Sequence, residues 1–293
     1  RTSYMLDLHG PCASYDTACS SALVACHAAR CALLLNECSA SVLSAVNLVL
    51  APAAGASFAV AGMTSPMGRS HTFDSRADGF ARAEGCGALI LRRGGGTVDE
   101  KDMQAITAAG CVVRQDGRSA SLTAPNGSAQ RDLLGATLAS AAVAASEFAL
   151  VEAHGTGTAL GDPIEAGSLV AALASPNGLR SVGGIKANVG HAEAAAGLAG
   201  LLKLMPLNTR RVASANVQLR LLNPHISSVV HGAGPHVLHA QLAATHAGGS
   251  TRVGGVSSFG YSGTIAHAVL RQNANSGGQR VRAPPLALAR RAV

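Results

Sequence analysis

Four polar stretches of this sequence carry residue types suited to acyl transfer. Cys19 stands among small residues, where a short extended run gives way to a long apolar helix pattern. At a helix N-terminus the unpaired N–H groups and the helix dipole favour the thiolate, the nucleophilic form of cysteine. Potential partners for this thiol lie in residues 152–158, 186–191 and 257–264. We therefore predict one site with Cys19 as its nucleophile, assembled from four separate segments.

Two histidines are the best candidates to meet this thiol. His154 follows a predicted strand and precedes Gly-Thr-Gly-Thr, and His191 lies between a strand pattern and a helix pattern. Loops at the carboxyl ends of strands are where α/β proteins assemble their sites. The alternative for Cys19 is that it is a small buried hydrophobic residue, like most cysteines. Five further histidines lack this setting and are expected to be surface or core residues: His225, His231, His236, His239 and His246.

The elements predicted around these residues alternate between strand and helix. Strand patterns occupy residues 40–50, 85–91, 104–113, 148–153, 181–186, 253–257 and 264–270. Helix patterns occupy residues 19–36, 128–145, 162–174 and 192–204, with Ser128 as one expected N-cap and Pro163 as one first helical residue. Residues 53–84 are predicted to be irregular. The alternation predicts an α/β fold in which helices cover a mostly buried sheet.

The composition fits a large packed domain, or two fused halves, in 293 residues. Apolar residues make up 48% and charged residues 13%, so most of the chain is expected to be packed interior. The net charge of +7 includes five arginines in residues 271–293, a stretch without acidic residues. We predict a basic flexible tail or linker at 272–293. Because aromatic residues are only 3%, base stacking has little support and no nucleic-acid partner is predicted.

The seven cysteines lack the spacing of a metal site. None forms a Cys-x-x-Cys pair, so we predict no bound metal. A nucleophilic thiol must stay reduced, which favours a reducing intracellular compartment, the cytoplasm or a plastid. Every long apolar stretch is interrupted by glycine, polar or charged residues, so no transmembrane segment is predicted.

Taken together, the motifs resemble those of the β-ketoacyl synthases, the ketosynthase domains of polyketide and fatty-acid synthases. Asp-Thr-Ala-Cys-Ser-Ser at 16–21 resembles the nucleophile signature of that family, and Glu-Ala-His-Gly-Thr-Gly-Thr at 152–158 resembles the second signature. Lys-Ala-Asn-Val-Gly-His at 186–191 resembles the third, and residues 255–264 resemble the C-terminal glycine-rich loop. The order and separations also match, and Gly-Thr-Gly-Thr is typical of modular polyketide synthases.

The resemblance implies the thiolase-like fold, with two similar βαβαβ halves in α/β/α layers. It begins close to the nucleophile, so we expect the first half to be incomplete and the chain to be truncated at its N-terminus. Residues 1–101 would be the C-terminal part of the N-terminal half, and residues 102–271 would be the C-terminal half with both histidines. The family also implies a homodimer.

The activity implied by the resemblance is decarboxylative condensation in polyketide or fatty-acid biosynthesis. An acyl group would pass from a phosphopantetheine thioester on an acyl carrier protein to Cys19. A malonyl-type extender would then lose carbon dioxide, and its carbanion would attack the acyl-cysteine. His154 and His191 would hold the thioester oxygen of the extender and stabilise the enolate. The domain itself would bind no cofactor.

Further roles follow from the same resemblance. Lys186 would pair with Glu165 and order the second histidine loop, a role that we favour over direct proton transfer. The backbone N–H groups of Cys19 and Tyr261 would form the oxyanion hole. Contacts to the pantetheine arm are expected from Thr156 and Thr158, and a gate from Phe259 and Tyr261.

The sequence departs from the family pattern at three places. Ser44-Ala45 stands where the family has Gly-Gly, Ile265 replaces an asparagine, and Tyr261 replaces a phenylalanine. The expected N-terminal truncation and Ile265 motivate an alternative hypothesis, a non-catalytic, truncated ketosynthase-like protein that serves dimerisation or carrier docking. A thiolase is disfavoured, because thiolases use a second cysteine near the C-terminus and none follows Cys111.

Overall fold

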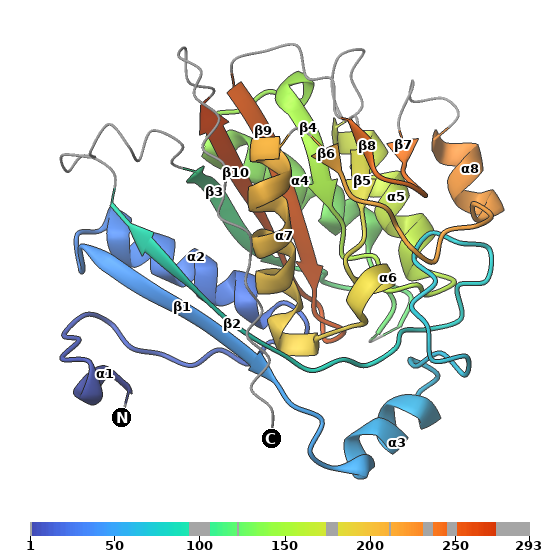
Figure 1. The fold of residues 1–293 in the computed structure, drawn as a ribbon, viewed down its shortest axis with the longest axis horizontal. Coiled ribbons are helices and arrows are strands. Elements are labelled where there is room, and N and C mark those ends of the chain that lie inside the picture. Colours follow the sequence, from blue (N-terminus) through green and yellow to red (C-terminus); the bar gives the residue numbers. More distant parts are fainter. Residues whose placement is uncertain are drawn as a thin grey trace, which may run out of the picture.

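A mixed six-stranded sheet forms the centre of the fold (Figure 1). The computed structural model describes residues 2–93, 106–121, 123–173, 181–210, 212–230, 237–244 and 251–273. The strand order is β3-β10-β9-β4-β5-β7. Strand β4 pairs in parallel with β5 and β9, whereas β10 runs antiparallel to both β3 and β9. The bounds are β3 (Ile106–Gln115), β4 (Phe148–Glu152), β5 (Ser181–Gly183), β7 (Val237–Leu238), β9 (Thr251–Phe259) and β10 (Thr264–Asn273).

Helices cover both faces of this sheet, which confirms the predicted α/β class (Figure 1). Helices α4 (Gly127–Ala141) and α5 (Gly161–Leu173) pack on one face, and α2 (Ser21–Leu34) and α7 (Ala196–Arg210) on the other. Beyond α2 and α7 lies an antiparallel pair, β1 (Ala40–Asn47) with β2 (Gly85–Arg92). The layer of α2 and α7 is therefore shared between two sheets.

Two apolar clusters fill the faces of the large sheet, and β4 is buried at all five positions. Leu134, Phe148 and Leu169 belong to the cluster on the α4/α5 side. Leu23 and Leu198 belong to the cluster beneath α2 and α7. Burial of each such side chain contributes roughly 1.5–3 kcal/mol. The apolar side chains of α2, which begins two residues after Cys19, thus hold this helix against the sheet.

Short elements complete the described part of the chain. They are α1 (Thr2–Met5), α3 (Pro52–Val60), α6 (Lys186–Val189), α8 (Pro224–Val230), β6 (Val212–Ala213), β8 (Ala243–Ala244) and 3-10 turns at Ala145–Glu147 and Glu193–Ala195. No helix among the described residues has both the length and the apolarity that a membrane span requires. The predicted tail at 272–293 lies almost wholly outside the described residues.

Two segment predictions were wrong in detail. Residues 53–84 are not all irregular, because Pro52 starts helix α3. The strand predicted to reach Lys186 ends at Gly183, so that Lys186 begins α6. The third signature therefore lies on a short helix rather than at the end of a strand.

Helix α4 differs from its prediction at both ends. It is capped by Asn126 rather than Ser128, because the Asn126 side chain accepts hydrogen bonds from the N–H groups of Ser128 and Ala129. The same helix ends at Ala141 rather than at 145, because the next residue, Ala142, has a left-handed conformation (φ 48°).

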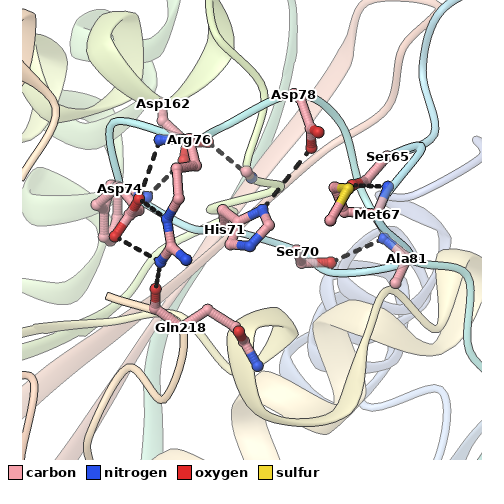
Figure 2. Close-up of polar contacts among 12 residues, drawn as sticks. Ser65, Met67, Ser70, His71, Asp74, Arg76, Asp78, Ala81, Asp162 and Gln218 are labelled. Atoms are coloured by element: carbon pink, nitrogen blue, oxygen red, sulfur yellow. Dashed lines mark hydrogen bonds and ion pairs between the residues drawn. The ribbon is translucent and has the colours of Figure 1, made fainter. Parts of the chain in front are cut away.

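Residues 63–84, here called the bridging segment, tie the site loops together without regular structure. Its buried Asp74 accepts hydrogen bonds from the Arg76 side chain (Figure 2). It also accepts hydrogen bonds from the N–H groups of Arg220 and Leu221. Burial alone would raise the pKa of Asp74, but these donors hold it well below its ordinary value. Asp74 therefore anchors the segment to the C-terminal half as a carboxylate.

Candidate active site

Cys19 sits on a strained elbow just before α2. The preceding Ala18 has a left-handed backbone (φ 52°), which is unusual for a residue other than glycine. Hydroxyl groups of the flanking motif hold this turn: Ser20 Oγ donates to Thr17 O at 2.9 Å and Ser21 Oγ to Ala18 O at 2.6 Å. The small polar residues around Cys19 are therefore the structural reason that its thiol projects from a sharp turn.

The glycine-rich turn after β9 closes over the nucleophile. Ser258 Oγ donates to Cys19 O at 2.6 Å. A Cβ added to Gly260 would lie 2.4 Å from Thr17 O, so only glycine permits this approach. The backbone N–H groups of Cys19 and Tyr261 lie near enough to the Cys19 thiol to lower its pKa. Two backbone N–H groups beside the thiol are what the predicted oxyanion hole requires.

His191 contacts the nucleophile directly. Its Nε2 lies 3.1 Å from Cys19 Sγ, and its Nδ1 accepts a hydrogen bond from Glu193 N at 3.0 Å. An Nδ1 that accepts from an amide carries no proton, so the neutral ring holds its proton on Nε2. Phe80 packs edge-on against the ring, with 4.8 Å between centroids. His191 thus presents an N–H donor to the space around Sγ.

His154 repeats this arrangement with a different partner. Its Nδ1 accepts a hydrogen bond from Phe259 N at 3.2 Å, which leaves the proton of the neutral ring on Nε2. The rings of His154 and His191 lie 5.9 Å apart, nearly perpendicular to each other. Burial and the charge of Lys186 hold the pKa of each ring well below its ordinary value. Both histidines are therefore neutral near pH 7, each with one Nε2–H to donate.

Lys186 and Glu165 act on the first histidine loop, which corrects the expectation that they pair and order the second. Glu165 accepts hydrogen bonds from His154 N at 2.7 Å and Gly155 N at 2.8 Å, while Lys186 Nζ donates to His154 O. Within the described residues no ion pair joins Lys186 to Glu165. Each side chain instead binds one side of the His154 backbone, and their charges interact through the space between them.

The thiol does not have the pKa that its helix position suggests. Burial raises the pKa of Cys19 to about 11, although the Lys186 charge and the two backbone N–H groups act in the opposite direction. The expectation of a thiolate favoured by the helix N-terminus is therefore wrong for the resting protein. Desolvation has the largest influence on this pKa, so Cys19 rests as a neutral thiol near pH 7.

A cavity of about 550 Å³ joins these groups to the surface. Cys19, His154 and His191 line it, together with both predicted gate residues and both predicted pantetheine contacts. The gate residues differ: Phe259 is buried against the His154 ring at 5.3 Å, while Tyr261 is half exposed and packs edge-on against Phe58 of α3. Thr156 and Thr158 hydroxyls lie 3.2 Å apart. Lys186 lies behind this wall rather than on it.

Several residues of the site were missed from the sequence. Asp162 accepts hydrogen bonds from Phe73 N at 2.7 Å and Gly157 N at 3.0 Å, and Thr72 Oγ1 donates to Gly155 O at 2.7 Å. The bridging segment therefore holds the Gly-Thr-Gly-Thr loop from outside. The sequence signal that could have identified this segment is its high density of polar residues in an otherwise apolar chain.

The substitution at Ile265 is accommodated by packing. Ile265 is fully buried in a small cluster with Leu133 and Phe259. The adjacent turn keeps its hydrogen bonds, from Gly260 N to Thr264 O at 2.8 Å and from Gly263 N to Gly260 O at 2.9 Å. Apolar contacts thus replace the amide that the family has at this position. Within the described residues, no cluster of histidine, cysteine and acidic side chains is arranged to hold a metal ion.

Sequence comparisons match two family models over most of the chain. Residues 1–95 match "Beta-ketoacyl synthase, N-terminal domain", and residues 106–219 match "Beta-ketoacyl synthase, C-terminal domain". Two phenolphthiocerol/phthiocerol polyketide synthase proteins of Mycobacterium tuberculosis are also similar to this chain. One is 42% identical over 97% of this chain, and the other is 39% identical over 93%. The chain spans only 15% and 18% of these two relatives, respectively.

Solved structures agree with the sequence matches. The ketosynthase from module 6 of the bacillaene synthase of Bacillus subtilis 168 superposes with a TM-score of 0.85 at 35% identity, over 94% of this chain and 49% of its own. A Streptomyces albus JA3453 oxazolomycin ketosynthase domain gives 0.85 at 32% identity, over 96% of this chain and 50% of its own. The fold is therefore thiolase-like, as predicted. The chain belongs to the β-ketoacyl synthase family of condensing enzymes, as a ketosynthase of the modular polyketide synthase type.

Proposed function

We propose that this chain catalyses decarboxylative condensation of acyl groups carried as thioesters on an acyl carrier protein. The observation that carries the proposal is the convergence of three groups in one cavity: the Cys19 thiol and the Nε2–H donors of His154 and His191. Two neutral donors beside a nucleophile suit a reaction that develops negative charge on a thioester oxygen. The family membership supports the same reaction class.

The first step transfers the acyl group. Cys19 sulfur attacks the carbonyl carbon of the carrier thioester, and the resulting oxyanion takes the N–H groups of Cys19 and Tyr261. The bond to the carrier sulfur breaks, and the proton from the Cys19 thiol ends on the carrier thiol. No net proton is gained or lost, so a resting thiol is a competent starting state. His191 Nε2–H, 3.1 Å from Sγ, stabilises the sulfur while it carries charge.

The second step makes the carbon–carbon bond. The extender's carbon–carboxylate bond breaks, carbon dioxide leaves, and the electron pair moves into an enolate. The enolate oxygen accepts hydrogen bonds from the Nε2–H groups of His154 and His191, whose rings are both neutral. The enolate carbon then attacks the acyl-cysteine, the tetrahedral oxyanion collapses, and Cys19 leaves as a thiolate that takes up one proton.

The carrier arm enters through the same cavity. Thr156 and Thr158 line it and supply hydroxyl groups for the amides of a phosphopantetheine arm, while Phe259 and Tyr261 form its gate. The partner is an acyl carrier protein, the working state is a homodimer, and the domain needs no resident cofactor. A reducing compartment fits a site whose nucleophile is a free thiol.

Thiol labelling and decarboxylation together test this proposal. Iodoacetamide or cerulenin should modify Cys19 faster than the buried Cys26 and Cys111, and also faster than the exposed Cys12 and Cys86 when cerulenin is used. The purified chain should release carbon dioxide from a malonyl-carrier and extend an acyl group, and Cys19→Ala should abolish extension. A chain that labels Cys19 no faster than Cys86 with cerulenin and forms no product would instead support the non-catalytic docking or dimerisation role.

A further inference from the structure

Glu193 holds an unusual backbone conformation two residues after His191. Its φ is 40°, in the left-handed region, which disfavours residues other than glycine. Such a conformation persists only where the surroundings enforce it. Its own N–H is the group that donates to His191 Nδ1 at 3.0 Å. The conformation at residue 193 therefore decides whether Nδ1 of His191 has a donor.

An ion pair holds the Glu193 side chain. Arg82 Nε lies 2.5 Å from Glu193 Oε1, and the two side chains are only 14% and 18% exposed. Partial burial makes such a pair stronger than one on the open surface. The pair joins the bridging segment to the turn that precedes α7, two parts of the chain more than a hundred residues apart.

Arg82 is itself fixed independently of Glu193. Its neighbours bond the backbone of His191 on both sides, with His191 N donating to Ala81 O at 2.7 Å and Ala83 N to His191 O at 2.9 Å. The Arg82 guanidinium also lies 5.2 Å over the ring of Phe58. A residue held at its backbone and along its side chain can serve as an anchor for a strained partner.

We propose that Arg82 and Glu193 are positioning residues for the condensation proposed above, on which this inference rests. Their ion pair holds the left-handed peptide at Glu193, and that peptide's N–H fixes the His191 ring with Nε2–H directed at Cys19. Loss of the pair releases residue 193 toward ordinary conformations, removes the donor from Nδ1, and leaves the ring free to rotate or to move its proton.

Two substitutions of Glu193 separate this role from plain packing. Glu193→Ala loses the ion pair, and alanine disfavours the positive φ that the pair enforces. The kcat for malonyl-carrier decarboxylation should therefore fall roughly five- to thirtyfold with little change in KM. Glu193→Gly also loses the anchor but adopts positive φ without strain, so its kcat should stay within about threefold of the unmodified protein. Arg82→Gln should behave like Glu193→Ala. The matched control is Arg131→Gln, which breaks an exposed pair with Asp132 on α4 and should change nothing.

The ¹⁵N resonance of His191 Nδ1 provides a readout that needs no turnover. It should move toward the position of an imidazole nitrogen without a hydrogen bond in Glu193→Ala and Arg82→Gln, but not in Glu193→Gly or Arg131→Gln. Equal losses for Glu193→Ala and Glu193→Gly, or an unmoved resonance in both Glu193→Ala and Arg82→Gln, would overturn the inference. A protein without condensing activity whose Nδ1 resonance still moves as expected would refute the proposed function and leave the positioning role intact.

Discussion

The two histidine loops reach the same chemical state by different means. His154 is held by fully buried charged side chains: Glu165 binds its N–H and that of Gly155, and Lys186 binds its carbonyl. His191 is held mainly by backbone, through two hydrogen bonds to the bridging segment on either side of Arg82. Both rings accept a backbone N–H at Nδ1 and keep their proton on Nε2. The two rings thus share the Nε2–H tautomer, although different groups hold the two loops in place.

This difference has an energetic consequence. Removing one buried charge lowers the stability of the folded state strongly, because the oppositely charged or polar partner stays buried without a group to offset it. Backbone bridges are insensitive to side-chain substitution, so the charged side-chain support of the His191 loop lies in the ion pair of Arg82 and Glu193. Loss of a charged side chain should therefore destabilise the first loop strongly and the second loop less.

Lys186→Met should produce the largest effect on stability. The change leaves the His154 carbonyl without its donor and removes the charge that offsets buried Glu165 and Asp162, at a cost of about 3–5 kcal/mol in the free energy of unfolding. Arg82→Gln in the second loop should cost only about 1 kcal/mol, because that pair keeps some solvent contact. Urea denaturation measures both. Equal costs would show that the two loops do not differ in the way described.

Glu165 should give the first loop a pH dependence that can be isolated. Burial raises its pKa to about 7 from an ordinary 4.5, so the folded state binds more protons than the unfolded state between those values. Its contribution to stability is therefore complete below pH 4.5 and is lost as pH rises through about 7, amounting to about 3 kcal/mol. Glu165→Gln cannot titrate, so the unfolding free energy of the unmodified protein relative to this variant should fall across that range.

Buried histidines act in the opposite direction and must be separated from this effect. Burial lowers the pKa values of His154, His191 and His267, so each favours folding more as pH rises toward 6.5. These residues are present in both proteins, and their contribution cancels in the difference. A difference that stayed flat between pH 4.5 and 7 would contradict the raised pKa of Glu165.

The site could be predicted from sequence where the information is local. Gly-flanked histidines after strands, and a cysteine at a helix start, identified Cys19, His154 and His191, and the structure brings all three into one cavity. The target of Lys186 could not be predicted, because its strand ends three residues early and the side chain turns to His154 O. The pKa of Cys19 also escaped prediction. The helix position is visible in the sequence, but the burial that outweighs it depends on packing from distant segments.

The fold also divides into elements that local sequence predicts and segments that depend on distant contacts. Apolar patterns in the sequence located α2, α4, α5, α7 and the main strands, because these elements bury apolar side chains in the two clusters of the core. The bridging segment has no helix or strand periodicity, because its hydrogen bonds join irregular turns within the segment and reach distant residues such as Gly155, Gly157 and Leu221. Its organising residue, Asp74, binds partners about 146 positions away. Contacts of this kind leave a polar composition in the sequence but no pattern that identifies the partner.

The aromatic neighbours of the two rings should give the smallest effect. Phe80 packs edge-on against His191 at 4.8 Å, and Phe259 lies tilted against His154 at 5.3 Å. Leucine keeps most of the buried apolar surface but loses the ring contact, which is worth about 1 kcal/mol. Phe80→Leu and Phe259→Leu should therefore each lower stability by about that amount in urea denaturation. Activity should fall more for Phe80→Leu, because Phe80 packs closer to its histidine ring than Phe259 does, and Nε2 of that histidine lies 3.1 Å from Cys19 Sγ. A larger loss of decarboxylation in Phe259→Leu would mean that side-chain packing, rather than the Nδ1 hydrogen bond, orients the first histidine.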